Sequence, residues 1–445
     1  MNPSGRSLDP TAIRSAQLFA AKVAGNVGYF VAVLLLARGL GAAGRGEIAF
    51  LIVVSLILAR VASLGVFETT TIFAAQRPAT RAAQLWTMVV FCVAGAAGLS
   101  LLAGGALLAL GSNAAAAITT TELTVLVAAT VAVAAADVGY AFLLGCDRFR
   151  EQALVTGFTP WLYALLLAAA WAGGWLTVVG AGLSWAIAQA LRAVWALAHS
   201  ARMIGFDRPS ASLLRESIGF GARAWIGSLA RFLNFRLDQV LMGFIATQAA
   251  LGTYAVAVNA SEVLLYLPSA MAVALMPLVA RSGHLAQTDL VLRAFRSAAL
   301  FTLGGVLVAA VLGPPLLPVV FGPEFRASVA PFLWLLPGAL GFTAMGVFSS
   351  ALVASSLPGR SSLGPVVSLT IGLGLALMLI PRFGPSGAAA ASSIAFLAGV
   401  IASLAVYRRA ATFPWSSLLI PHRGDLDIFR ALARPFRRAP ELRQS

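Results

Sequence analysis

The sequence predicts an all-α integral membrane protein with about twelve transmembrane helices arranged in two six-helix bundles. The first observation is composition: of 445 residues, 60% are hydrophobic and 11% are charged, with a mean hydropathy of +0.89. Soluble domains carry about 25% charged residues, so this chain has too few charges to cover a surface exposed to water. The other two observations are the recurrence of long apolar runs and the placement of the basic residues between them.

A helix needs about 20 mainly apolar residues to cross the hydrocarbon core of a bilayer. Charged residues and Gly or Pro positions separate such runs at residues 13–38, 46–70, 82–110, 119–145, 152–173, 177–201, 217–245, 250–280, 291–312, 326–355, 361–381 and 386–407. We therefore expect an N-terminal cytoplasmic arm (1–12), a first bundle (13–205), a cytoplasmic linker (206–216), a second bundle (217–407) and a basic cytoplasmic tail (408–445).

The basic residues predict the orientation of these spans. With both termini in the cytoplasm, about 21 basic residues lie in inside segments and about four in outside segments. The outside four are Arg38, Arg45, Arg326 and Arg382. This bias follows the positive-inside rule and requires an even number of spans.

A short internal match supports two related halves. Gly46 follows the first outside turn and Gly252 follows the turn after the seventh span, 206 residues later. Each glycine precedes an apolar helix start. Since six is even, two six-helix halves would be parallel repeats about an axis along the membrane normal.

Several other function classes lack their signatures. The net charge of +15 could suggest nucleic-acid binding, but an Arg excess in cytoplasmic loops explains it better. Cys92 and Cys146 lie far apart and give neither a disulfide framework nor a metal spacing. There is no phosphate-binding glycine loop, metal cluster or nucleophile motif. We therefore expect no cofactor, no metal, no nucleic-acid partner and no enzymatic activity.

Polar residues inside the spans are the candidates for function. A charge in the hydrocarbon core costs about 2.5–3.5 kcal/mol, so it tends to face a cavity or a partner. Helical spacing places such residues on shared faces. The faces are Lys22, Asn26 and Tyr29 in span one; Trp185, Gln189, Arg192 and His199 in span six; Arg223, Gly227, Arg231, Asn234 and Asp238 in span seven; and Asn259, Glu262 and Tyr266 in span eight.

From these faces, and from Arg60 inside span two and Asp137 inside span four, we select two groups. The candidate substrate-binding residues are Lys22, Asn26, Arg60, Arg192, Arg231 and Asn234. The candidate ion-pair or coupling residues are Asp137, Asp238 and Glu262. The cationic excess suits an anionic substrate group, because guanidinium groups hold phosphate through paired hydrogen bonds.

Simpler interpretations stand beside this one. Arg223 could extend to the cytoplasmic interface, as long basic side chains do. Asp137 and Arg192 could form a purely structural ion pair between neighbouring helices, and Arg236 could pair locally with Asp238. For Lys22, Arg60 and Arg231, deep in their spans, a cavity-lining role is the favoured interpretation.

Particular segments resemble a known family. Leu36–Glu47 is similar to the first outside turn of polysaccharide (oligosaccharide-lipid) flippases. Arg236–Gly243, Leu251–Ala257 and the pairs Leu267-Pro268 and Met276-Pro277 resemble the seventh and eighth spans of that family. The family belongs to the multidrug/oligosaccharidyl-lipid/polysaccharide exporter superfamily, and the likeness extends over residues 12–410.

The resemblance implies a V-shaped pair of bundles that work by alternating access. It implies translocation of an undecaprenyl-pyrophosphate-linked oligosaccharide across the cytoplasmic membrane, with Lys22, Arg60 and Arg231 contacting the phosphates. The implied partners are the lipid-linked glycan, the bilayer and glycan polymerase or assembly proteins. The alternatives are a cation-coupled multidrug exporter, a peptidoglycan-precursor flippase and, in another class, a membrane-embedded glycosyltransferase or ligase.

Overall fold

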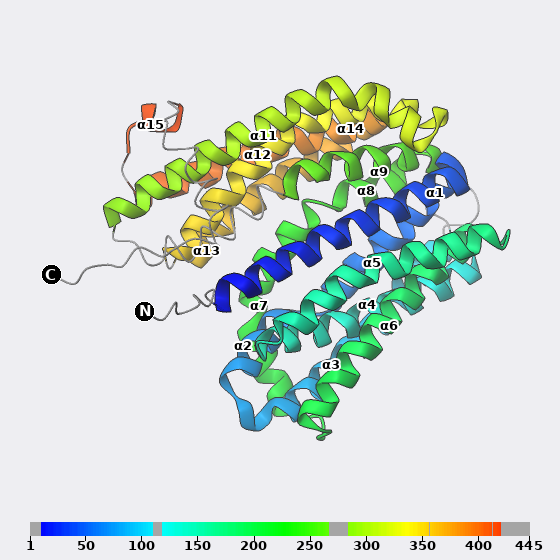
Figure 1. Cartoon of the computed structure of the whole chain (residues 1–445), viewed down its shortest axis with the longest axis vertical. Coiled ribbons are helices and arrows are strands. Elements are labelled where there is room, and N and C mark those ends of the chain that lie inside the picture. Colours follow the sequence, from blue (N-terminus) through cyan, green and yellow to red (C-terminus); the bar gives the residue numbers. More distant parts are fainter. Residues whose placement is uncertain (1–9, 110–117, 267–283, 356, 412, 420–445) are drawn as a thin grey trace, which may run out of the picture.

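The computed structural model describes residues 10–109, 118–266, 284–355, 357–411 and 413–419, and every regular element within them is a helix (Figure 1). The first half contains α1 (Pro10–Ala62), α2 (Val66–Gln76), η1 (Pro78–Thr80), α3 (Arg81–Ala109), α4 (Thr120–Gly145), α5 (Phe149–Ala172) and α6 (Val178–Ile204). The second half contains α7 (Ala211–Leu233), α8 (Leu237–Ile245), α9 (Gln248–Glu262), η2 (Val263–Leu265), α11 (His284–Phe321), η3 (Pro323–Ser328), α12 (Val329–Ala354), α13 (Pro358–Ser361), α14 (Leu363–Ala410) and α15 (Ser416–Leu419).

These helices account for the twelve expected crossings. Eight helices in the described residues are long and apolar enough to cross a membrane. The helices α1 and α14 each contain two crossings, because Gly41 (φ 68°) and Gly384 (φ 53°) turn the chain with backbone angles that favour glycine. The pair α7–α8 corresponds to the expected seventh span, and α9 and η2 form the described part of the expected eighth.

Two expected spans are broken inside the molecule. The run 46–70 is divided where α1 ends at Ala62 and α2 begins at Val66, with Gly65 at φ 86° between them. The run 217–245 is divided between α7 and α8. Of the run 250–280, the described residues end at Tyr266, so Pro268 and Pro277 lie outside them.

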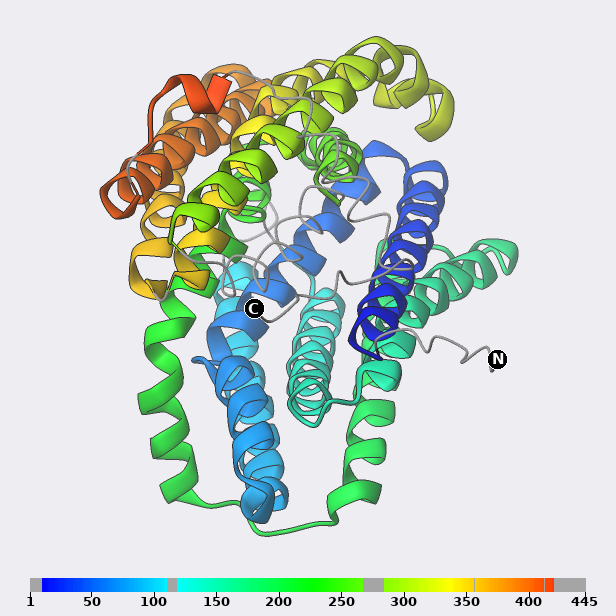
Figure 2. The same ribbon diagram turned by 60° about the vertical axis from the view of Figure 1, so that its left-hand side comes forward.

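The two halves lie one above the other in Figure 1, with the start of α1 and the end of α14 at the left. We call this end, where α1 begins and α14 finishes, the terminal side, and the opposite end, with Gly41 and Gly384, the far side. Figure 2 shows α6 and α7 joined by the loop at the bottom of the view, where the chain passes from one half to the other.

Small residues allow the helices of each half to pack closely. In the first half, Ala59, Ala62 and Ala96 lie in one buried cluster with Met88 and Phe142. Large apolar side chains point outward instead: Leu102 is 74% exposed, Val311 73% and Ile401 68%. Small residues inside and large apolar residues outside are expected when the surrounding solvent is lipid.

A shared core joins the halves. Phe50 and Leu51 of α1 lie in the same buried cluster as Met242 of α8 and Leu251 and Tyr254 of α9. Toward the terminal side, α7 packs against α2 and α3 of the first half and against α14 of the second. The seam between the halves is therefore formed mainly by α1, α7, α8 and α9.

Candidate functional site

The polar faces of spans one and eight meet at a cavity between the halves. Asn26 and Tyr29 of α1 face Asn259 of α9 and Tyr266 across a space of about 360 Å³. Apolar side chains complete its wall: Val23, Val27, Phe30, Val33 and Val263. The structure thus brings one asparagine and one tyrosine from each of these two faces to a common space, whereas Lys22 and Glu262, on the same two faces, do not line it.

A second, mostly apolar cavity of about 320 Å³ lies beside the first. The two share Val23, Val263 and Tyr266, and the second extends to Phe301 of α11. Several of these apolar side chains are exposed, including Val23 (44%) and Phe301 (43%). The seam between α1, η2 and α11 thus has an apolar wall next to a polar one.

The first half contains a cluster of two arginines around one carboxylate. Arg192 of α6 donates a hydrogen bond to Asp137 of α4 at 3.1 Å and another to Gln189 at 3.2 Å. Arg60 of α1 forms an ion pair with the other oxygen of Asp137 at 3.9 Å. All three charged side chains are partly exposed, at 24% for Arg60, 27% for Asp137 and 19% for Arg192.

The structure therefore contains the ion pair between Asp137 and Arg192 that the sequence suggested, and adds Arg60 to it. Two guanidinium groups around one carboxylate leave a net positive charge. Helix α7 covers this cluster: Trp225 donates to the carbonyl of Arg60 at 3.0 Å, and the guanidinium of Arg60 lies 5.5 Å from the ring of Phe232.

The next predicted cation, Arg231, lies in the last turn of α7. It is exposed, and it lies within electrostatic range of Glu68 of α2. One oxygen of Glu68 is buried without a hydrogen-bond partner in the described residues. Lys22, by contrast, is an exposed side chain on α1, one turn before Asn26. The predicted cations therefore form no single cluster: Arg60 and Arg231 lie near the contact of α7 with the first half, Arg192 pairs within the first half, and Lys22 is exposed on α1.

Asn234 has a structural task. Its amide donates to the carbonyl of Ala230 at 2.9 Å and to the carbonyl of Pro365 in α14 at 2.8 Å. These bonds hold the end of α7 against α14. Because the chain then turns before α8 begins, the single stripe expected from Arg223 to Asp238 is broken after Asn234.

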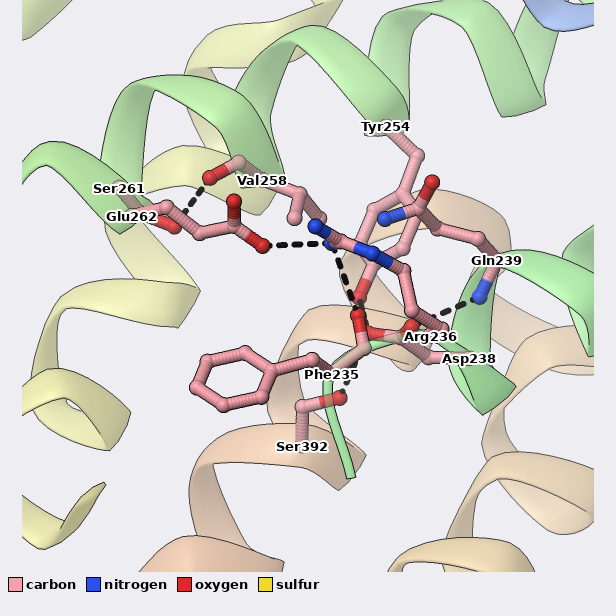
Figure 3. Close-up of polar contacts among 9 residues, drawn as sticks. All are labelled: Phe235, Arg236, Asp238, Gln239, Tyr254, Val258, Ser261, Glu262 and Ser392. Carbon is pink, nitrogen blue, oxygen red and sulfur yellow. Dashed lines mark hydrogen bonds and ion pairs between the residues drawn. The ribbon is translucent and has the colours of Figure 1, made fainter. Parts of the chain in front are cut away.

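Asp238 is the centre of a partly buried hydrogen-bond network in the second half (Figure 3). The hydroxyl of Tyr254 donates to its Oδ2 atom, as does the hydroxyl of Ser392 at 3.1 Å, and the backbone N–H of Gln239 donates to Oδ1 at 2.7 Å. Two small cavities, about 20 and 30 Å³, border Asp238 and Ser392. Each has room for one or two water molecules or a small ion.

Arg236 forms its ion pair with another carboxylate. Its guanidinium donates to Glu262 at the end of α9 at 2.6 Å (Figure 3). The expected local pair of Arg236 with Asp238 is therefore replaced by a bridge between α8 and α9. Glu262 also lines one of the small cavities beside Asp238.

Three polar residues of this region were missed from the sequence. Tyr254 was noted only as part of the Leu251–Ala257 resemblance, with no role of its own, and no sequence signal pointed to Ser392. Arg45, expected in an outside loop, is instead buried in α1, with 3% of its surface exposed. Its side chain forms no hydrogen bond or ion pair with the described residues, and its Nε atom is buried without a partner. It lies within electrostatic range of Tyr29 and Tyr163.

Comparison with known proteins gives a consistent picture. The family model described as "Polysaccharide biosynthesis protein" matches residues 35–330. The probable flippase AglR of Haloferax volcanii is 25% identical over 222 residues, 47% of this chain and 46% of AglR. The matched part thus spans about half the length of this curated relative.

Two solved structures show the same fold over nearly the whole chain. A structure of the lipid II flippase MurJ in an inward closed conformation has a TM-score of 0.72 at 14% identity, covering 97% of this chain and 94% of MurJ. An inward-facing multidrug resistance MATE transporter has a TM-score of 0.67 at 14% identity, covering 86% of this chain and 94% of the transporter. At such low identity, these likenesses concern the fold alone.

Proposed function

The chain belongs to the polysaccharide biosynthesis protein family, and from this premise we propose that it is a flippase for a lipid-linked oligosaccharide. The proposed substrate is a glycan joined to a polyprenyl lipid through pyrophosphate, such as an undecaprenyl-linked polysaccharide precursor. The proposed location is the cytoplasmic membrane, with both termini in the cytoplasm. Glycan polymerase or assembly proteins would then receive the product on the other side.

The observation that carries this proposal is the excess of arginine around Asp137 and Glu68, where α7 meets the first half. Arg60, Arg192 and Arg231 outnumber the carboxylates of Asp137 and Glu68 near them. A pyrophosphate group needs several guanidinium or ammonium partners, which hold its oxygens through charge-assisted hydrogen bonds. Asp137 contacts Arg60 at a longer distance than it contacts Arg192. In this proposal, the pyrophosphate therefore displaces Asp137 from Arg60.

The apolar cavities suit the other end of such a substrate. The spaces between α1, η2 and α11 are lined mainly by valine, leucine and phenylalanine and border exposed apolar side chains. A polyprenyl chain could therefore remain in the bilayer while its head group lies between the halves. Lys22, Asn26, Tyr29 and Asn259 offer polar groups for the sugars along the same seam.

The network around Asp238 is our candidate for energy coupling. A partly buried carboxylate with three hydrogen-bond donors and water-sized cavities beside it can take up a proton or Na⁺ from one side and release it to the other. Glu262 would exchange between Arg236 and the same small space. In this proposal, occupation of the site biases the relative position of the halves, which then rock to expose the glycan on the far side.

A cation-coupled multidrug exporter is the second candidate, favoured by the same carboxylate and by the fold shared with the MATE transporter. The excess of arginine around Asp137 and Glu68 favours an anionic substrate over the cationic drugs that acidic cavities accept. A peptidoglycan-precursor flippase shares the fold too, but such proteins usually have additional spans.

The experiment uses cells that depend on this chain for surface glycan. Arg60→Ala and Arg231→Ala should each abolish surface glycan while the protein remains at normal abundance in the membrane. Arg215→Ala, on the exposed face of the same helix as Arg231, serves as the matched control and should have no effect. Normal glycan in both variants would refute the proposed phosphate contacts. Drug resistance on overexpression, without a glycan defect on deletion, would support the exporter instead.

A further inference from the structure

Two contacts on the far side join the halves through helix ends. The guanidinium of Arg38, near the end of the first segment of α1, donates from Nε to the carbonyl of Val320 at 2.8 Å and from Nη2 to that of Val319 at 2.7 Å. These carbonyls lie in the last turn of α11, which ends at Phe321. The last carbonyls of a helix lack partners within the helix and form its negative end. Arg38 of the first half therefore caps a helix of the second.

The second contact has the opposite polarity. Gly41 breaks α1, so Ala42 begins a new helical segment whose first N–H groups have no acceptor within the helix. An oxygen of Glu324, from η3 of the second half, accepts a hydrogen bond from the N–H of Ala42 at 3.3 Å. A carboxylate is favourable at the positive end of a helix. Glu324 of the second half therefore caps a helix of the first.

Between these caps the two backbones touch. Gly46 of α1 and Gly252 of α9 face one another where the helices cross, in equivalent positions of the two halves. A Cβ atom on Gly46 would overlap the carbonyl of Gln248, and one on Gly252 would overlap that of Ala42. No side chain separates the halves at this point, so the far side of the seam is closed by direct backbone contact.

We propose that Arg38 and Glu324 form a reciprocal latch. The latch holds the halves together on the far side and must open before they can separate there to release substrate. This inference rests on the proposed function, in which the halves rock about their seam. Both side chains are exposed, so each contact changes an equilibrium by only about two- to five-fold. Contacts of this strength favour the closed state but can still break in every transport cycle. A buried ion pair would resist breaking.

The test measures the far-side separation directly. Spin labels are placed at Ala43→Cys and Ala327→Cys, two exposed far-side positions in different halves, in a protein whose Cys92 and Cys146 are replaced by alanine. Distances are measured in lipid nanodiscs without substrate. Arg38→Ala and Glu324→Gln should each raise the ratio of long to short distances about two- to five-fold. The double variant should exceed either.

Two matched controls keep the result specific. Glu122→Gln removes a far-side carboxylate that caps a helix within its own half, through its bond to the N–H of Thr119 at 2.7 Å. Arg382→Ala removes an exposed far-side arginine. Both controls should keep the wild-type distances. Unchanged distances in both latch variants, or equal shifts in the controls, would overturn the latch.

A further variant tests the seam by steric overlap. Gly46→Ala places a methyl group against the Gln248 carbonyl and should force long distances in the same labelled protein. If this variant fails to fold, the exposed Arg38 and Glu324 variants still decide the question. The distance measurement needs no substrate, so it tests the latch independently of the proposed function. If the variants open the far side as described but the wild-type protein transports no lipid-linked glycan, the proposed function is refuted and the latch is supported.

Discussion

Arg192 donates to Asp137 at 3.1 Å, while Arg60 approaches the second oxygen of the same carboxylate only to 3.9 Å. Asp137 is thus held firmly on one side and loosely on the other. The looser contact leaves the guanidinium of Arg60 available to a competing anion. All three side chains are partly exposed, so the cluster is accessible from outside the protein.

Asp137→Asn should therefore change substrate release rather than substrate recognition. Without the carboxylate, no group returns to Arg60 when the phosphate leaves, so the affinity for the lipid-linked glycan should rise and the turnover should fall. We expect about a two- to five-fold fall in transport rate, because a partly exposed ion pair such as that of Asp137 with Arg60 contributes about 0.2–1 kcal/mol. Binding is measured with the purified protein and transport with proteoliposomes. Weaker binding together with normal turnover would contradict this role.

Asp238→Asn tests whether this carboxylate couples transport to an ion gradient. The amide oxygen can still accept from Tyr254 and Ser392, but the side chain no longer carries a negative charge that a proton or Na⁺ could neutralise. Substrate binding should remain within about twofold of wild type, while transport driven by an imposed ion gradient should vanish. Adding Gln239→Glu to this variant places a carboxylate one residue away and should not restore gradient-driven transport. Gradient-driven transport at the wild-type rate in Asp238→Asn would rule the site out.

Arg45 carries a prediction about stability and function together. A buried guanidinium without an ion pair destabilises a fold, so Arg45→Met should raise the free energy of unfolding by about 1–3 kcal/mol. If the charge serves transport, the same variant should lose most of its activity. Arg326→Met, at an exposed far-side arginine, is the control for loss of a positive charge. A stabilised variant with full activity would remove Arg45 from the transport mechanism.

Much of this arrangement was predictable from the sequence. Helical spacing placed Asn26 with Tyr29 on one face and Asn259 with Tyr266 on another. The meeting of the two faces at one cavity is seen only in the structure. The pair of Asp137 and Arg192 was also foreseeable, because opposite charges deep in neighbouring spans have few other partners.

Other features depend on breaks that composition does not reveal. The chain turns between Asn234 and Leu237, and this turn directs Arg236 toward Glu262 and away from Asp238. Arg45 lies between two glycines, a pattern typical of a loop, yet the helix resumes directly after Gly41 and buries it. Tyr254 and Ser392 contact Asp238 only because their helices pack beside α8. The sequence around these two hydroxyl groups does not reveal which helices become neighbours.

The last prediction concerns pH and the terminal side. Arg77 donates to Glu216 of α7 at 2.7 Å, and this hydrogen bond lowers the pKa of Glu216 below its ordinary value of 4.5. A carboxyl group whose pKa is lowered by folding stabilises the folded state fully above its ordinary pKa. That stabilisation is lost as the pH falls through the lowered pKa. The attachment of α7 to the first half should therefore weaken below about pH 4.5.

The measurement is thermal unfolding of the purified protein as a function of pH. Wild type should lose stability relative to Glu216→Gln between neutral pH and about pH 3, because only the wild type has a carboxylate to protonate at this contact. Arg77→Ala should remove the same difference, since the partner that lowers the pKa is then absent. Arg148→Ala, which breaks a pair between Arg148 and Glu151 elsewhere on the terminal side, should leave the difference in place. Parallel pH curves for wild type and Glu216→Gln would show that this contact does not stabilise α7 against the first half.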